Sequence, residues 1–113
     1  MFNDVTGVAL HSALAGLSAR QRAIADNIAN VQTPGYLARR TQFEDSLRQA
    51  VASGSGVATP TSARSLEPTR EDGNNVNLDH EVISNIDTGL RYQLVTRAVD
   101  DRFTLMRTAL RTQ

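Results

Sequence analysis

The sequence contains no cysteine, no lysine and no tryptophan, and aromatic residues make up only 4% of its 113 residues. Without cysteine, the chain has no disulfide, no thiolate metal site and no thiol nucleophile. Because large aromatic side chains dominate compact cores, their scarcity argues against a thick globular core. The length fits one small folding unit.

A surplus of one charge is also missing, since twelve arginines balance twelve acidic residues and the formal net charge is zero. Nucleic-acid binding is therefore not expected, because phosphate backbones attract proteins with a basic surplus. The first cationic side chain is Arg20, and polar residues interrupt the segment before it. We accordingly expect no secretory signal peptide and no membrane span.

The side chains that carry chemistry are few and scattered. His11 and His80 are the only histidines, and neither has a second ligand at metal-binding spacing. Asp100 and Asp101 are adjacent, so on a helix they point in different directions and do not share a proton. A small hydrolase would need a nucleophile and a base at matching spacing. The sequence therefore predicts no catalytic residue, no metal ligand, no cofactor and no small-molecule substrate.

The segment from Val5 to Val31 has no proline and is rich in alanine, which favours a long helix. Its apolar residues recur at alternating spacings of three and four, the heptad pattern of a helix that packs along another helix. We interpret them as the first half of an assembly seam, made of Leu10, Leu14, Leu17, Ile24, Ile28 and Val31.

The end of this helix has a distinctive composition. Asn27 and Asn30 lie three residues apart in its last turn, where asparagine is a poor helix former but bonds free backbone carbonyls well. The segment Thr33-Pro34-Gly35-Tyr36 follows and predicts a type II turn, because Pro34 fixes its own φ and Gly35 readily takes a positive φ. We therefore predict that the two amides close the helix and that the turn redirects the chain.

The middle of the chain is polar. Thr41 and Glu44 match a capping box, which predicts a short helix over about residues 42–52. Residues 53–77 are rich in glycine, proline, serine and threonine, and they predict a linker-like arm that is either extended or disordered. Asp72-Gly73-Asn74-Asn75 is a turn signal near its end.

Residues 78 to about 111 again lack proline and predict a second long helix. Acidic residues gather near its start and arginines near its end. The helix dipole favours this distribution, which would also let the acidic half of one copy meet the basic half of another in a staggered stack. The apolar residues of this helix form the second half of the assembly seam: Ile83, Ile86, Leu90, Leu94, Ala98, Leu105 and Leu110.

The predicted fold is all-α, with two long terminal helices forming a coiled-coil-like pair. It divides into a long helix with its Pro-Gly turn (1–36), a short helix (37–52), a polar linker or arm (53–77) and a second long helix (78–113).

Residues 23–36 resemble the signature of bacterial flagellar rod and hook proteins. The motif positions are Asn27, Asn30, Thr33, Pro34, Gly35 and Tyr36. Residues 72–79, 90–93, 102–103 and 107–110 are in turn similar to the proximal members of the flagellar basal-body rod protein family.

The resemblance implies a non-enzymatic structural subunit of the proximal rod, which self-assembles with other rod proteins into a helical drive shaft. It implies contacts with copies of itself, with other flagellar rod proteins, and with the MS ring and export gate at the base of the rod. It also implies export into the flagellum by the flagellar type III system, without a signal peptide. Members of the family place their two terminal helices in an inner layer and the middle segment outside.

The residues alone leave a second hypothesis open, which is a soluble helical adaptor or secretion chaperone. Such a protein would show the same apolar seams, but it would bury them in a stable dimer of fixed size.

Overall fold

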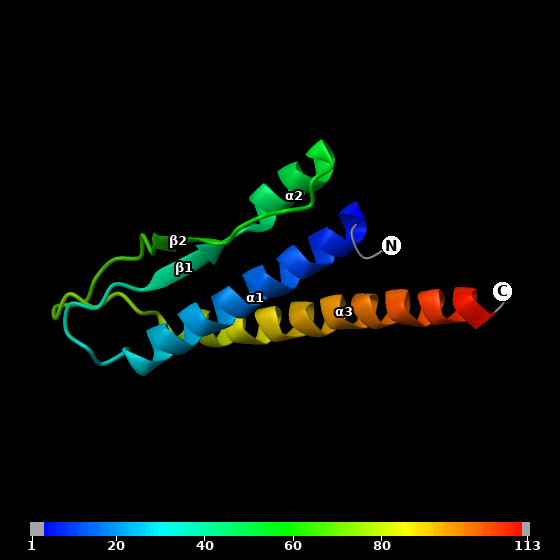
Figure 1. The fold of residues 1–113 in the computed structure, drawn as a ribbon. Coiled ribbons are helices and arrows are strands. Elements are labelled where there is room, and N and C mark those ends of the chain that lie inside the picture. Colours follow the sequence, from blue (N-terminus) through cyan, green and yellow to red (C-terminus); the bar gives the residue numbers. More distant parts are fainter. Residues whose placement is uncertain (1–3, 112–113) are drawn as a thin grey trace.

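The structure is a computed structural model that describes residues 4–111; residues 1–3 and 112–113, the outer ends of the first and last predicted segments, lie outside this range. The order of elements is α1 (Val5–Ala29), β1 (Arg39–Gln42), α2 (Glu44–Ser53), β2 (Thr61–Arg64) and α3 (Leu78–Arg111). Helix α1 is the middle layer, with α3 along one side and the strands and α2 on the other (Figure 1). The molecule is elongated, measuring 67 × 26 × 14 Å.

The chain is mostly helical, as predicted, but the all-α prediction is wrong. Strands β1 and β2 pair antiparallel, with Arg39 opposite Arg64 and Gln42 opposite Thr61. Strand prediction depends on alternating apolar and polar residues, and none of the eight strand residues is buried. The strands form because long-range contacts hold β1 against α1. Such contacts cannot be predicted from the residues next to each strand in the sequence.

Helix α1 begins at Asp4, whose Oδ1 accepts from the Gly7 N–H at 2.8 Å. It ends at Ala29, two residues before the predicted end. The core against it is thin, as the scarcity of aromatic residues predicted. Within the described range the buried apolar residues are Leu17, Ile24, Ala38, Phe43, Ala50 and Val76.

The predicted capping box of α2 is wrong. The helix begins at Glu44 after Phe43, and no side chain caps it. Thr41 lies in β1, and its carbonyl accepts from Arg20 Nη2 at 2.9 Å. The same Arg20 nitrogen donates to Glu44 Oε2 at 2.8 Å, and the guanidinium lies 4.9 Å from the centre of the Phe43 ring. Glu44 is therefore engaged by α1 and does not complete a capping box.

The polar arm is extended and anchored to α1, so the disordered alternative is wrong. Gly56 lies against the helix backbone, where an added Cβ would be 2.8 Å from the Val5 carbonyl oxygen. The Ser12 hydroxyl donates to the Gly56 carbonyl at 2.9 Å and accepts from the Ala58 N–H at 3.2 Å. A buried serine thus holds a segment whose composition is typical of a free linker.

Helix α3 faces α1 with a different set of residues from the predicted seam. Its two buried residues are Glu81 and Thr88, which are 5% and 0% exposed. The predicted aliphatic seam residues of α3 are mostly exposed, so the pair is not joined by two matching apolar seams. Ala98 is half-buried. Exposed fractions between 60% and 70% are found at Ile83, Ile86, Leu90, Leu94, Leu105 and Leu110.

Two helical glycines allow a matched test of this packing. An added Cβ at Gly16 would lie 2.5 Å from the Phe43 ring, whereas at Gly89 it would meet nothing within 4 Å. We expect Gly89→Ala to raise the free energy of unfolding by about 1 kcal/mol through helix propensity. We expect Gly16→Ala to lower it by about 1–3 kcal/mol through overpacking. Urea denaturation measures both, and equal stabilisation by the two changes would contradict the position of Phe43.

Candidate functional site

Asn27 joins three elements at one buried point. It is 1% exposed, and its Nδ2 donates to the Arg39 carbonyl at 2.9 Å and to Glu81 Oε1 at 3.0 Å. Its Oδ1 accepts from the Arg39 N–H at 3.0 Å and from the Tyr36 hydroxyl at 3.2 Å. Because the amide bonds both backbone groups of Arg39, it takes the place of a neighbouring strand beside β1. The prediction that Asn27 closes the end of its own helix is wrong.

The turn after α1 has the predicted geometry. Gly35 has a φ of +75°, and the Tyr36 N–H donates to the Thr33 carbonyl at 3.3 Å, as a type II turn requires. Asn30 closes the helix as predicted, because its Nδ2 donates to the Asp26 carbonyl at 2.8 Å. The Asn30 Oδ1 also accepts from the Thr33 hydroxyl at 3.0 Å, which ties the helix end to the turn.

Two buried asparagines before α3 hold the end of α1 and the turn after it in place. We call this segment, residues 27–36, the exit of α1. Asn74 is 0% exposed, and its Nδ2 donates to the carbonyls of Asn30 and Thr33, at 2.8 Å each. Asn75 Oδ1 accepts from the Ala38 N–H at 2.6 Å. The Asn74 amide thus satisfies a free carbonyl at the end of α1, that of Asn30, and one in the turn, that of Thr33. These contacts bring the start of α3 beside the end of α1.

Sequence reasoning missed the contacts of Glu81, Asn74 and Asn75. In the sequence, Asn74 and Asn75 indicate only a turn, and the position of Glu81 near the start of its helix is explained by the helix dipole. A signal was nevertheless present, because two adjacent asparagines exceed what a turn needs. Their amides bond residues more than thirty positions away, so their partners could not be identified from local spacing.

The electrostatics of the exit favour the observed bonds. Burial raises the pKa of the Tyr36 hydroxyl, and the negative charge of Asp26 adds to the effect. The hydroxyl therefore stays protonated near neutral pH and remains a donor to Asn27.

A second contact joins the start of α1 to the last third of α3. Arg102 Nη2 donates to Asp4 Oδ2 at 2.8 Å. The Gly7 N–H and the Arg102 guanidinium hold the pKa of Asp4 below its usual value. Asp4 thus caps α1 and bonds α3 at the same time.

The first half of α3 presents an aliphatic surface to solvent. We name it the outer stripe, and it consists of Ile83, Ile86, Leu90 and Leu94, which are 60–69% exposed. Single exposed aliphatic side chains are ordinary, but a contiguous set of four is typical of an interaction surface. The α1 half of the predicted seam is different, because Leu17 and Ile24 are buried within the chain itself, at 2% and 4% exposed.

Among residues 4–111, no three side chains of histidine, aspartate or glutamate lie close enough together to hold a metal ion. None of the helices in the described part of the chain has the length and apolar character needed to cross a membrane.

Comparison with known proteins identifies the family. A family profile described as "Flagella basal body rod protein" matches residues 9–36. The flagellar basal body rod protein FlgB of Escherichia coli (strain K12) is 35% identical, over 71% of this chain and 74% of its own length. FlgB of Borrelia hermsii is 32% identical, over 76% of this chain and 81% of its own length. The chain belongs to the FlgB family of flagellar basal body rod proteins.

The similarity to the FlgB family extends over most of the chain. FlgB of Bacillus subtilis (strain 168) is 25% identical over 89% of both sequences. The chain is accordingly a structural subunit of the flagellar basal body rod and not an enzyme. Membership of the rod implies assembly with other flagellar rod components. Residues 9–36 contain every predicted motif position and the whole α1 half of the seam.

We expect Asn27→Ala to lower the free energy of unfolding by about 3 kcal/mol, because Glu81 and the backbone of Arg39 lose their buried partner. Urea denaturation at neutral pH measures the change. Asn85→Ala is the matched control, since Asn85 is exposed on α3, and it should alter stability by less than about 0.5 kcal/mol. Equal stability of the two variants would show that the Asn27 contacts are not needed for folding.

The contact between Arg20 and Glu44 predicts a pH dependence. The Arg20 hydrogen bond holds the pKa of Glu44 below its usual value, so the ionised form stabilises the fold above the unfolded pKa, and this contribution is lost as the pH falls. We therefore expect Glu44→Gln to be less stable than the native chain at about pH 7, and we expect this difference in stability to be smaller at about pH 3. Urea midpoints at both pH values test this, and a constant difference would contradict it.

Proposed function

We propose that this chain is a subunit of the proximal rod, at the base of the rod beside the MS ring and the export gate. There it assembles with copies of itself and with other flagellar rod proteins into the helical drive shaft. The observation that carries the proposal is the outer stripe of α3 in a chain of the FlgB family.

The outer stripe supports assembly because burial stabilises such a surface only when another molecule covers it. Each Å² of apolar surface removed from water contributes about 25 cal/mol, and within the described range these four side chains remain largely uncovered. A rod subunit makes such contacts repeatedly along the shaft. The resemblance of residues 72–79, 90–93, 102–103 and 107–110 to proximal rod proteins supports the position at the base of the rod.

The same resemblance supports export through the flagellar type III system. A subunit destined for the rod must reach its growing end, and a small chain with a thin core and no cysteine has few structural obstacles to passing through a narrow channel while unfolded.

The outer stripe can be tested without disturbing the fold. Leu90 is 62% exposed, so Leu90→Asp should leave the helical circular dichroism and urea midpoint close to those of the native chain. In a strain that lacks the native protein, we expect this variant to be exported but not to restore swimming, because burial of an unpaired carboxylate at a subunit contact is costly. Thr96→Asp is the matched control, since Thr96 is exposed on the same helix outside the stripe, and it should restore swimming.

Normal swimming with Leu90→Asp would overturn the assembly role of the outer stripe. A stable dimer of fixed size at all protein concentrations, together with absence of the native chain from isolated basal bodies, would instead favour the soluble adaptor or secretion chaperone.

A further inference from the structure

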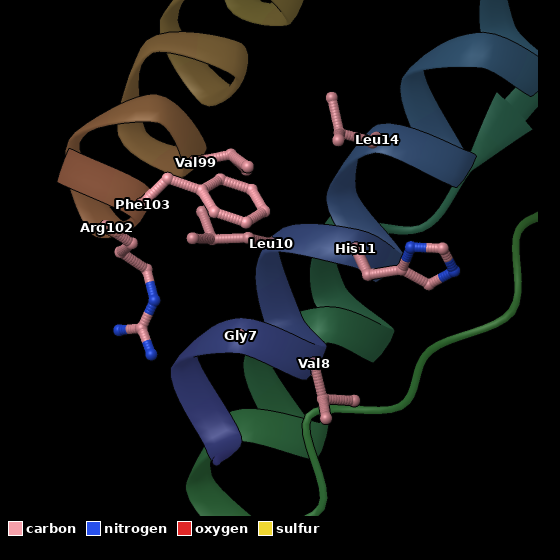
Figure 2. Close-up of a pocket in the computed structure, with 8 residues that line it drawn as sticks. All are labelled: Gly7, Val8, Leu10, His11, Leu14, Val99, Arg102 and Phe103. Atoms are coloured by element: carbon pink, nitrogen blue, oxygen red, sulfur yellow. The ribbon is translucent and has the colours of Figure 1, made fainter. Parts of the chain in front are cut away.

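A groove lies between the first turns of α1 and the last third of α3 (Figure 2). Its volume is about 370 Å³, and its walls are mostly apolar: Val8, Leu10 and Leu14 come from α1, and Val99 and Phe103 from α3. Figure 2 shows the Phe103 ring beside Leu10, with the imidazole of His11 pointing away from that ring. Arg102, bonded to Asp4, lies at the groove.

The groove and the outer stripe are two apolar surfaces at different positions along the long axis of the molecule. The stripe is centred near Leu90 and the groove near Phe103, which are thirteen residues apart on α3. At about 1.5 Å per residue, this offset is about 20 Å along the long axis. The stripe projects from the helix surface and the groove is recessed, so their shapes suit contact with each other.

The charges around these surfaces are complementary. The first half of α3, residues 78–94, which bears the stripe, carries three acidic side chains and one arginine. The second half, residues 95–111, which forms one wall of the groove, carries four arginines and two aspartates. Contact of stripe with stripe across a two-fold axis would bring two acidic segments together, whereas contact of stripe with groove brings opposite charges together.

We propose that the groove receives aliphatic side chains from the outer stripe of a second copy of this chain. The contact is heterologous, because each copy uses the stripe toward one neighbour and the groove toward the other. Interfaces of this type generate open helical assemblies when the rotation does not close a ring. The choice of a second copy as occupant rests on the proposed rod function.

The absence of cysteine makes a direct test available, because any introduced thiol is unique in the chain. Leu14→Cys places a thiol in the groove, and Leu90→Cys places one in the stripe. We expect basal bodies from cells that produce both variants to yield, on mild oxidation, a disulfide-linked dimer containing one chain of each kind. Disulfides form only when the two Cα atoms come within about 7 Å. Val99→Cys with Ile86→Cys provides a second pair of positions.

The matched control replaces the groove thiol with Ala25→Cys, because Ala25 is exposed on α1 outside the groove. This control should give no dimer with Leu90→Cys. Dimers formed by Leu90→Cys alone would overturn the proposal in favour of a two-fold contact. Absence of mixed dimers from both pairs would also overturn it. Incorporation of the unmodified chain into basal bodies, measured in parallel, tests the rod function separately, so the two ideas can fail independently.

Discussion

The side-chain amide of Asn27 is the contact on which the geometry of the molecule depends. An amide offers two donor and two acceptor positions, and Asn27 uses all four on β1, on α3 and on Tyr36. Because both backbone groups of Arg39 are bonded by the same side chain, β1 is held in register against α1 although its own residues are polar and none of them is buried. Because Glu81 is bonded there too, the start of α3 is fixed relative to the end of α1.

The local features of this fold were predictable from sequence, and the long-range ones were not. Missing prolines and apolar spacing located the two long helices, and the order Pro34-Gly35 located the turn, because these signals act within a few residues. The two strands escaped prediction because polar residues form them and α1 supports them. Thr41 and Glu44 had the spacing of a capping box, but Arg20, more than twenty residues away, binds both. The motif at the exit was found from sequence, but the partners of Asn27 and Asn74 were not.

Helix α3 buries polar side chains and exposes aliphatic ones, which is the reverse of what is expected for a single chain in water. Its buried residues are polar, and the Thr88 hydroxyl has no hydrogen-bond partner among the described residues. The four aliphatic residues of its outer stripe face solvent instead. Burial of a polar group is unfavourable unless it is bonded, so this arrangement does not maximise the stability of the single chain. It keeps the apolar surface available for other molecules, which is the requirement on a subunit whose final state is an assembly.

Stability and assembly are consequently assigned to different residues. The amides of Asn27, Asn74 and Asn75 hold the start of α3 at the end of α1, and the exposed ion pair of Arg102 with Asp4 is a further contact of α3 with the start of α1. Because Val99 and Phe103 of the groove lie on the same helix as the stripe, the two surfaces keep a constant offset along α3. Identical offsets in every copy are what a regular helical assembly needs, because a repeated contact generates a uniform shaft only if each subunit presents its two surfaces in the same relative position.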